Sequence, residues 1–228
     1  MKRIIFFLIV FSTSFLSCHK DNDSVPALSG VDYFPAVIGS YKIYDVHLIE
    51  YSNDTIDSTF QMKEVIQDTF YYNNTVVYEL YRFYRSDNTQ PWPDQPDSVW
   101  TFTTDRNQIT IQESSVNFIR LSFPLSSGKV WDGNTRNTYL RDDYMASTYA
   151  SPSTVSNIYY PETCNIVEEK SKNLVYKDYR NRVYAKDIGL IYKHAEYIAY
   201  NTSPSLIGQD IIDYGSIREE TLIEYGKP

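Results

Sequence analysis

Residues 59–84 read TFQMKEVIQDTFYYNNTVVYELYRFY, and this stretch decides the fold class. Its two halves, 59–70 and 75–84, are rich in β-branched and aromatic residues, which strands prefer. Asn73 and Asn74 separate them, and asparagine tolerates the positive φ that a tight hairpin turn requires. The stretch therefore predicts a β-hairpin with strands over 59–70 and 75–84.

The same composition recurs in short runs along the rest of the chain, and no window of a dozen residues shows a helical period. About ten short strands predict an all-β fold: an antiparallel, strongly curved sheet that forms a partial barrel or a sandwich. Segment 134–156 is rich in Thr, Ser, Asn and Asp, and we expect a long loop with a short strand there. The other strands are expected at 40–51, 98–104, 108–113, 117–123, 163–169, 174–179, 183–186, 189–200 and 221–225.

A weak internal repeat is visible in the pattern Phe-Pro-x-x-x-Gly, which occurs at 34–39 and again at 123–128. The pattern indicates a proline-stiffened entry, a glycine turn and then a strand. Two copies are compatible with duplicated half-sheets or with chance, because only three positions are shared.

The N-terminus has the features of an export signal. Lys2 and Arg3 precede an apolar run of about a dozen residues, which is shorter than the roughly 20 residues of a membrane span. Ser17 directly before Cys18 resembles the signal of bacterial lipoproteins, whose cysteine receives lipid and whose new N-terminus is acylated, for example with palmitate. The alternative is an ordinary signal peptide with an incidental cysteine. The expected organisation is a signal peptide over 1–17, a tether over 18–30 and a single all-β domain over 31–228.

A lipid on Cys18 predicts attachment to the outer membrane, because two or more acyl chains give stable anchoring. A lysine followed by acids in 19–24 resembles the surface-export signal of Bacteroidota lipoproteins. His19 follows the cysteine where enteric inner-membrane lipoproteins have aspartate. The cell surface and the periplasmic face both stay open as the side on which the domain lies.

The charge excludes one class of partner. The formal net charge is −8, and removal of 1–17 leaves 19 of the 21 basic residues against 29 acidic ones, a net charge of −10. A nucleic-acid binder would need a basic face, so we expect none as a partner. Two cysteines are too few for a four-thiolate zinc site.

Three segments together resemble a group of uncharacterised Bacteroidota lipoproteins. They are YFPAVIGSYKIYDV at 33–46, LSFPLSSGKVWDGN at 121–134 and VYAKDIGLIYKHAEYI at 183–198. The sequence departs from the FPxxxG and YAxxxGLxY patterns of that group at Lys42 and Ile43, where tryptophan is expected nearby, and at Asp187, where glycine is common. The group has no established activity, so the resemblance implies an exported lipoprotein and nothing more specific.

The sequence offers no strong catalytic or metal motif. Cys164 is the one thiol left after lipidation, and we expect it to be a buried strand residue. His47 and His194 lie in strand-like runs, and a Cys164–His194 pair has no support from their spacing. G-x-S-x-G, H-x-x-H, paired C-x-x-C and EF-hand spacings do not occur. We therefore expect no catalytic residue, no metal and no cofactor.

Adjacent acids argue against a hydrolase of glycosides. Glu168-Glu169 and Glu219-Glu220 would point to opposite faces of their strands. Such pairs are poorly placed for the two carboxylates that glycoside hydrolysis needs.

Aromatic residues give the best candidate binding surface. Trp92, Trp100 and Trp131 are candidate sugar-stacking residues, and Trp92 lies in the proline-rich stretch PWPDQPDSVW at 91–100. The alternative is that the aromatic residues pair across strands within the sheet.

Short Asp-Ser and Asp-Thr motifs resemble the O-glycosylation sites of exported Bacteroidota proteins. They are equally compatible with ordinary turn chemistry, and we expect them in loops or at loop edges. The candidate acceptors are Ser24, Thr55, Ser58 and Ser98.

The expected function is a non-catalytic binding module for a glycan, a peptide or a partner protein. The alternative is a lipid or lipoprotein carrier, and a hydrolase is the third hypothesis. A closed apolar cavity would favour the carrier, and a row of exposed Trp and Tyr would favour the binding module. A concave cluster of His47 or His194 with a carboxylate would favour the enzyme.

Overall fold

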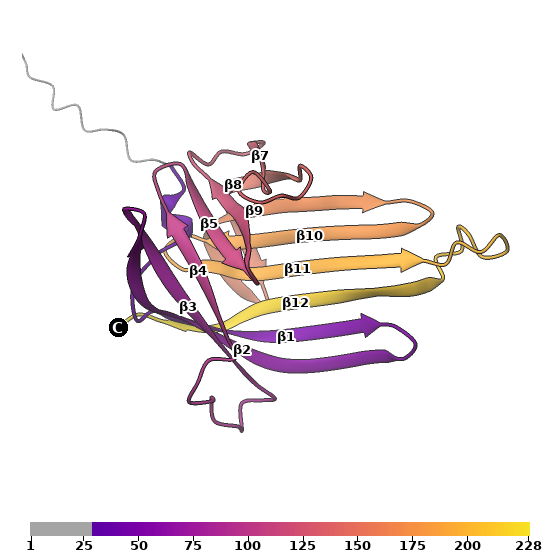
Figure 1. Ribbon diagram of the computed structural model, residues 1–228, viewed down its shortest axis with the longest axis horizontal. Coiled ribbons are helices and arrows are strands. Elements are labelled where there is room, and N and C mark those ends of the chain that lie inside the picture. Colours follow the sequence, from indigo (N-terminus) through magenta and orange to yellow (C-terminus); the bar gives the residue numbers. More distant parts are fainter. Residues whose placement is uncertain (1–28) are drawn as a thin grey trace, which may run out of the picture.

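The computed structural model describes residues 29–228, which form one antiparallel twelve-stranded sheet and a short 3-10 helix, η1 (Val31–Tyr33) (Figure 1). The sheet curls into a nearly closed barrel, which confirms the expected all-β, antiparallel and strongly curved fold. The strands are β1 (Tyr41–Tyr51), β2 (Thr55–Tyr72), β3 (Thr75–Arg85), β4 (Ser98–Thr104), β5 (Gln108–Glu113), β6 (Val116–Ser122), β7 (Val130–Asp132), β8 (Asp143–Val155), β9 (Ile158–Lys172), β10 (Tyr176–Ala185), β11 (Gly189–Tyr200) and β12 (Ile212–Gly226).

The strands follow chain order in the sheet except at its middle. The order is β6-β5-β4-β3-β2-β1-β12-β11-β10-β9-β8-β7, so the first strand pairs with the last, and β6 and β7 lie at the two ends. Each half of the chain thus supplies six neighbouring strands. The hairpins β1–β2, β9–β10 and β11–β12 run on beyond the barrel, to the right in Figure 1.

The chain contacts the barrel from Ser29 onward. The Leu125 amide donates to the Ser29 carbonyl at 2.9 Å, and Ser29 Oγ donates to the Leu125 carbonyl at 3.1 Å. The last residues of the expected tether are therefore packed against the domain. The expected signal peptide over 1–17, the lipid site Cys18 and the candidate acceptor Ser24 lie outside the described residues.

The hairpin expected at 59–84 is confirmed. Asn73 and Asn74 have φ values of 47° and 61°, and Tyr72 pairs with Thr75 across the two-residue turn. Positive φ at both central positions is the geometry that closes a right-twisted two-residue hairpin.

The loop expected at 134–156 is wrong for its second half, because β8 occupies thirteen residues there. Tyr144 and Ala146 are buried, Met145 between them is exposed, and the serines of the strand are half-buried. Pairing with β9 rather than composition determines its structure. Similarly, 174–179 and 183–186 belong to one strand, β10, because Arg180, Asn181 and Arg182 between them pair with β9 and β11.

The repeated Phe-Pro-x-x-x-Gly pattern ends in a similar glycine turn in both halves. Gly39 and Gly128 have φ values of 82° and 83°, a region that favours glycine. The Gly39 amide donates to the Ile66 carbonyl at 2.7 Å, and the Gly128 amide donates to the Ala146 carbonyl at 2.7 Å. Each motif therefore ties the start of one half to its second strand, as a duplicated half-sheet requires.

The two ends of the sheet meet at a seam between β6 and the start of the loop after β7. The Ile119 amide donates to the Gly133 carbonyl at 2.9 Å, and Trp131 Nε1 donates to the Ile119 carbonyl at 2.9 Å. Asn137 Nδ2 donates to the Asn117 carbonyl at 2.7 Å. At this seam, side-chain hydrogen bonds thus replace much of the backbone ladder that joins neighbouring strands elsewhere in the sheet.

Ion pairs cross the inside of the barrel behind this seam. Arg120 on β6 contacts Glu113 on β5 at 2.7 Å and Glu168 on β9 at 3.0 Å. Arg182 on β10 contacts the same two carboxylates at 3.5 and 2.6 Å. The side chains of Arg120, Arg182 and Glu168 are 7% exposed or less. Arg120 therefore links the last strand of the first half to the second half.

A second group of ion pairs continues inside the barrel on β11 and β12. Glu220 contacts Lys193 at 3.1 Å and Arg218 at 2.6 Å. A cavity of only about 40 Å³ is left between the charged groups, with Lys193, Arg182 and Glu113 in its wall. This volume holds a water molecule or two. The barrel interior is consequently ionic as well as apolar.

The cations set the protonation of the buried carboxyl groups. Burial alone would raise the pKa of Glu113, but Arg120, Arg182 and Lys193 outweigh burial and lower its pKa to about 2. Burial would also raise the pKa of Glu168, but Arg120 and Arg182 outweigh burial and lower this pKa. Both groups therefore stay ionised and paired at neutral pH.

This arrangement predicts acid sensitivity. The folded-state pKa of Glu113 lies below its ordinary value of 4.5, so its contribution is fully present above pH 4.5 and is lost as the pH falls toward 2. We expect Glu113→Gln to be less stable than wild type at pH 7 by on the order of 3 kcal/mol. Its stability should fall less steeply between pH 5 and 3. Urea unfolding at several pH values measures the free energy of unfolding of wild type and of Glu113→Gln. Equal slopes of this free energy against pH would contradict the role of Glu113.

Candidate binding groove beside the bare edge of β2

β2 extends beyond its neighbour β3. It pairs with β1 over its first eleven residues, from Thr55↔Tyr51 to Val65↔Tyr41, but its pairing with β3 begins only at Gln61↔Arg85. After Arg85 the chain leaves the sheet as the loop 86–97. Residues 55–60 therefore form a bare edge, and in the described chain no backbone hydrogen bond from another segment reaches it.

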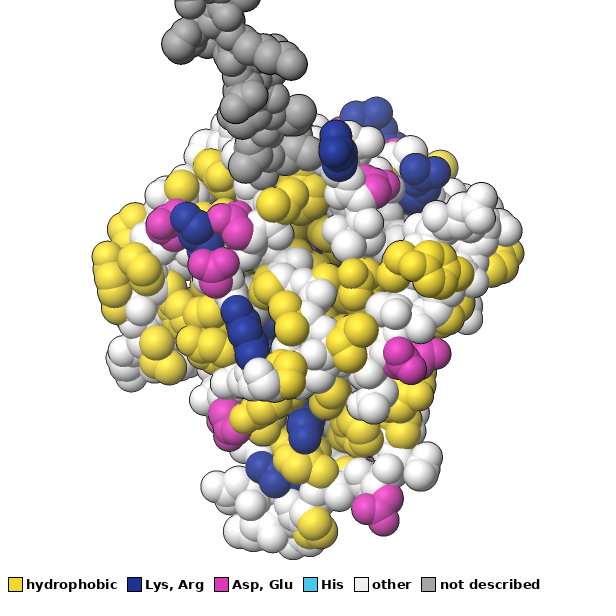
Figure 2. Space-filling model, turned by 90° about the vertical axis from the view of Figure 1, so that its left-hand side faces the viewer, with side chains coloured by type: hydrophobic (Ala, Val, Ile, Leu, Met, Phe, Trp, Pro, Cys, Tyr) yellow, Lys and Arg dark blue, Asp and Glu magenta, His cyan; other side chains and the backbone are white. Residues whose placement is uncertain are grey.

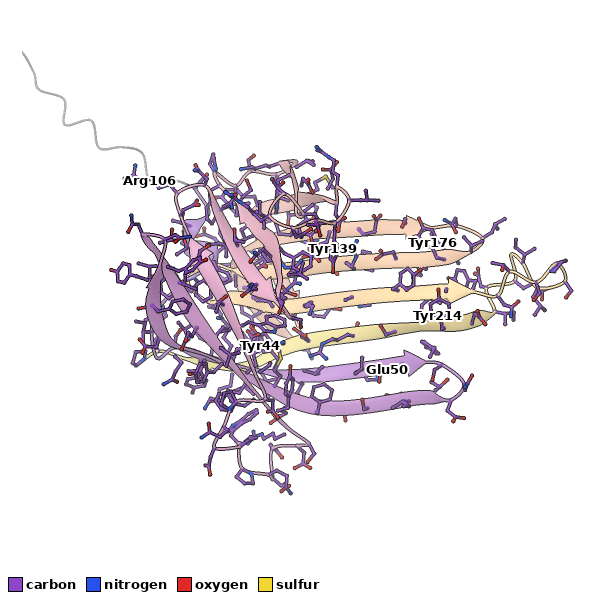
Figure 3. The ribbon with its side chains drawn as sticks, viewed as in Figure 1. Tyr44, Glu50, Arg106, Tyr139, Tyr176 and Tyr214 are labelled. Carbon is purple, nitrogen blue, oxygen red and sulfur yellow. The ribbon has the colours of Figure 1, made fainter. Side chains whose placement is uncertain are left out.

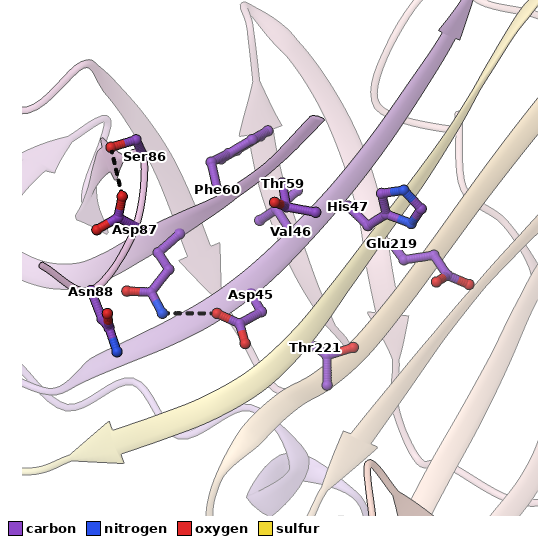
Figure 4. A pocket seen from close by; sticks show the side chains of 11 residues that line it. Asp45, Val46, His47, Thr59, Phe60, Ser86, Asp87, Asn88, Glu219 and Thr221 are labelled. Atoms are coloured by element: carbon purple, nitrogen blue, oxygen red, sulfur yellow. Dashed lines mark hydrogen bonds between the residues drawn. The ribbon is translucent and has the colours of Figure 1, made fainter. Parts of the chain in front are cut away.

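An open groove of about 370 Å³ lies where this bare edge meets the loop 86–97 (Figure 4). Its walls come from β1, β2, β12 and the start of the loop. Its side chains are mostly polar, and include Asp45, His47, Gln61, Asp87, Asn88 and Glu219.

Strand alternation and register place these side chains together. On β1, Tyr44 and Val46 are buried, so Asp45 and His47 point to the opposite, outer face. Asp45 lies across from Gln61 on β2 and Thr221 on β12, and His47 lies across from Thr59 and Glu219. Two adjacent cross-strand rows thus form the floor of the groove.

A chain of hydrogen bonds fixes the wall of the groove. Arg85 Nε donates to Gln61 Oε1 at 2.8 Å, and Gln61 Nε2 donates to Asp45 Oδ1 at 2.8 Å. The Arg85 guanidinium also donates to the Gln90 carbonyl at 3.0 Å and lies 4.1 Å from the centre of the Trp92 ring. The loop is therefore held against the sheet, and Trp92 stacks on Arg85.

The groove is acidic. Asp45, Asp87 and Glu219 line it, and His47 is its one basic side chain among the lining residues. Hydrogen bonds from the side chain and backbone of Thr89 lower the pKa of Asp87, which stays ionised. His47 Nε2 lies 2.8 Å from Asp57 Oδ1 and is thus already engaged with an acid. Such a site repels anions and accepts hydrogen bonds from cationic or neutral donors.

Both histidines lie across from the same acid in the strand register, and His194 contacts it. His47 and His194 are each directly across from Glu219 in the strand register. His194 Nδ1 lies 3.0 Å from Glu219 Oε1, and the Tyr192 hydroxyl donates to the same oxygen at 3.0 Å. Within residues 29–228, no group of three His, Cys, Asp or Glu side chains is placed to hold a metal.

The expectation for adjacent acids is confirmed at Glu219 and Glu220. The Glu219 side chain is 41% exposed on the outer face, whereas Glu220 is buried inside the barrel. Sequence reasoning missed Glu219 as the partner of His194, because cross-strand register is not encoded in local spacing.

Cys164 is a buried core residue, as expected. It packs in the apolar cluster of the barrel, and burial raises the pKa of its thiol to about 12. His194 is bonded to Glu219 on the outer face, so the structure does not bring Cys164 and His194 together.

The three tryptophans do not form one platform. Trp131 is buried and closes the seam, and Trp100 lines the interior with the Arg82 guanidinium 3.7 Å above its ring. Trp92 alone lies on the outer loop, where it is half-buried. The indoles of Trp100 and Trp131 therefore have structural contacts rather than exposed faces.

The candidate glycosylation residues lie at or near strand ends. Thr55 and Ser98 are the first residues of β2 and β4. Ser58 is the fourth residue of β2, and its Oγ donates to the Leu48 carbonyl at 3.3 Å. Its expected loop position is therefore wrong, because β2 begins four residues earlier than its composition indicates.

A row of tyrosines marks the opposite face of the projecting sheet. Tyr176 and Tyr214 flank Ala199 in the register, and the strands that carry them extend past the barrel (Figure 3). Tyr197 lies two residues before Ala199, and its ring stacks on Tyr176 with a centroid separation of 6.4 Å and a 20° interplanar angle. Tyr197 and Tyr214 are 44% and 54% exposed.

The end of the barrel near the tether has a mixed surface. Hydrophobic side chains there are scattered among charged and polar ones (Figure 2), which is the usual character of a solvent-exposed surface. Among the described residues, no helix has the length and apolar character that crossing a membrane requires.

Comparison with known proteins finds distant structural likeness. No protein-family model matches the sequence, and no curated protein matches it significantly. One solved structure, described as an exported protein of Bacteroides fragilis with a YmcC-like fold, has 10% identity and a TM-score of 0.42. Another, described as a lipoprotein of Parabacteroides distasonis, has 10% identity and a TM-score of 0.41. Both matches cover 85% of this chain and 98% of the other. These descriptions are of the class expected from the N-terminal sequence, but likeness this weak transfers no activity or ligand to the chain.

Proposed function

We propose that the chain is an exported, lipid-anchored protein of the outer membrane whose β domain is a non-catalytic binding module, with the groove beside β2 as its binding site. The open, polar groove of about 370 Å³ carries this proposal. Its floor is built on three paired strands and its wall is held by Arg85 and Gln61, so the site is formed before a ligand arrives.

The position of the groove is compatible with an anchor at Cys18. The described chain starts at the upper left of Figure 1, whereas the β3–β4 loop that walls the groove lies at the bottom. The described chain therefore begins on the side of the domain away from the groove.

The interior of the barrel speaks against the carrier alternative. A lipid chain needs a large apolar cavity, but the cavity inside the described barrel measures about 40 Å³, and charged side chains line it together with apolar ones. Arg182, Glu168 and Glu220 are buried there in ion pairs. Their removal from their partners would cost several kcal/mol, so an acyl chain would not displace them.

Sugar binding on the tyrosine row is a second candidate function. Tyr176 and Tyr197 offer near-parallel rings, and Tyr214 lies beside them. Ring faces and phenol hydroxyls suit sugar CH groups and hydroxyls respectively. If this candidate is right, Tyr197→Ala should abolish oligosaccharide binding.

The anchor is tested by Cys18→Ala. We expect wild-type protein in the membrane fraction and the variant in the soluble fraction, because the variant has no thiol to receive lipid. Immunoblots of fractionated cells measure the distribution, with Cys164→Ala as the matched control that keeps the lipid site. A Cys18→Ala protein that stays with the membranes would contradict the anchor.

The groove is tested by filling it. Thr221→Trp places a large ring on its floor, while Thr101→Trp adds the same ring on β4, away from the groove. Neutral oligosaccharides and short peptides are titrated into wild-type protein, and NMR shift changes locate their contacts. We expect changes at Asp45 and Asn88 that Thr221→Trp weakens at least tenfold and Thr101→Trp leaves in place. Shift changes confined to other surfaces would contradict the groove as the binding site.

A further inference from the structure

We infer that the bare edge of β2, together with the acidic groove, binds an extended cationic peptide as an added β-strand. This inference rests on the proposed function, because it names the ligand class of the same groove. The backbone of β2 supplies the pairing groups, and the carboxylates beside it supply the preference for charge.

The backbone geometry is that of an unfinished ladder. β2 is paired on one side along 55–60, and β3 stops pairing on the other side at Gln61↔Arg85. Every second residue of 55–60 therefore points its N–H and C=O into solvent on the bare side. A peptide strand lying there would continue the line of β3, and six residues offer roughly 20 Å of edge.

The edge lacks most of the features that normally block pairing. Proteins protect exposed edges with charged residues, above all lysine, and with proline, bulges or covering segments. Residues 55–60 read TIDSTF, without lysine or proline, and Asp57 is their one charged residue. The irregularity in β2–β3 pairing lies further along, between Ile66 and Asp68. Thr55, Ile56, Asp57 and Thr59 are exposed, so an incoming strand would reach them without displacing other groups.

The charges beside the edge favour a basic ligand. Glu50, Asp54 and Asp57 are exposed at the end of the β1–β2 hairpin, and Asp45 and Asp87 lie in the groove. The basic groups nearby are already engaged: His47 contacts Asp57, and Arg85 donates to Gln61. Lysine or arginine at alternate positions of a peptide strand would project toward these carboxylates.

A second copy of this chain fits the edge less well. Two β2 edges in antiparallel pairing centred on Asp57 would bring the two Asp57 carboxylates opposite each other, and like charges across a ladder are destabilising. The whole chain is also acidic, with a formal net charge of −8. The charge pattern therefore favours a basic peptide over self-association.

Binding of the peptide (Lys-Val)4 to the whole described domain tests this inference. We expect calorimetry to show binding that weakens with added salt, and NMR hydrogen exchange to show protection of alternate amides in 55–60. (Glu-Val)4 should bind at least tenfold more weakly. (Lys-Val)4 with N-methyl groups on alternate residues should also lose at least tenfold, because it keeps the charge but loses the backbone donors.

A matched pair of protein variants separates local charge from net charge. Asp57→Lys should weaken (Lys-Val)4 binding at least tenfold, whereas Asp68→Lys, an exposed acid further along the same strand, should leave it within about twofold. Equal effects of the two variants would mean non-specific attraction and would overturn the inference.

The remaining outcomes distinguish the inference from the proposed function. If oligosaccharides shift Asp45 and Asn88 but no peptide protects 55–60, the groove is a binding site and strand addition is wrong. If neither probe shifts the groove, both proposals fail. If ultracentrifugation shows a dimer whose 55–60 amides are protected without peptide, a second copy occupies the edge and the peptide inference is overturned.

Discussion

The buried contact between Arg120 and Glu168 determines how the sheet closes. Arg120 lies on β6 and Glu168 on β9, so the pair joins the two halves of the chain across the inside of the barrel. Among the described residues, the seam itself has one backbone hydrogen bond, between Ile119 and Gly133, and side-chain bonds from Trp131 and Asn137. Buried ion pairs are costly to desolvate, but a buried charge without its partner costs more. Opening the seam would separate the two charges, so the pair raises the free energy of an open seam by more than it lowers the free energy of the closed seam.

The candidate site follows from closing a sheet whose strands differ in length. β2 has eighteen residues and β3 has eleven, while β4 to β6 have seven or fewer. Once the shorter strands have met the second half at the seam, the ends of the longer ones project beyond the barrel (Figure 1). The start of β2 then has no neighbour on one side, and the chain that leaves β3 forms a groove beside it. The groove is thus a consequence of the topology, and its acidic character comes from the outward-facing residues of β1 and β12.

Local patterns in the sequence predicted the all-β fold and the Asn73-Asn74 turn. They did so because hairpin turns and strand alternation depend on neighbouring residues. The strand nature of 143–155 was missed, because the segment is rich in Ser and Thr and its strand structure depends on pairing with β9. The role of Trp131 at the seam and the contact between His194 and Glu219 depend on register between distant strands. The bare edge could not be predicted either, since it exists only because the pairing of β2 with β1 and its pairing with β3 begin at different residues.

The central claim is that the ion pair between Arg120 and Glu168 holds the seam between the two ends of the sheet closed. A double-mutant cycle with Arg120→Met, Glu168→Leu and the combined variant measures it directly through urea unfolding at pH 7. We predict a coupling free energy of about 2 kcal/mol or more, with each single variant destabilised and the double variant recovering much of the loss. A coupling within about 0.5 kcal/mol of zero would contradict the claim and would leave closure to the hydrogen bonds of the seam.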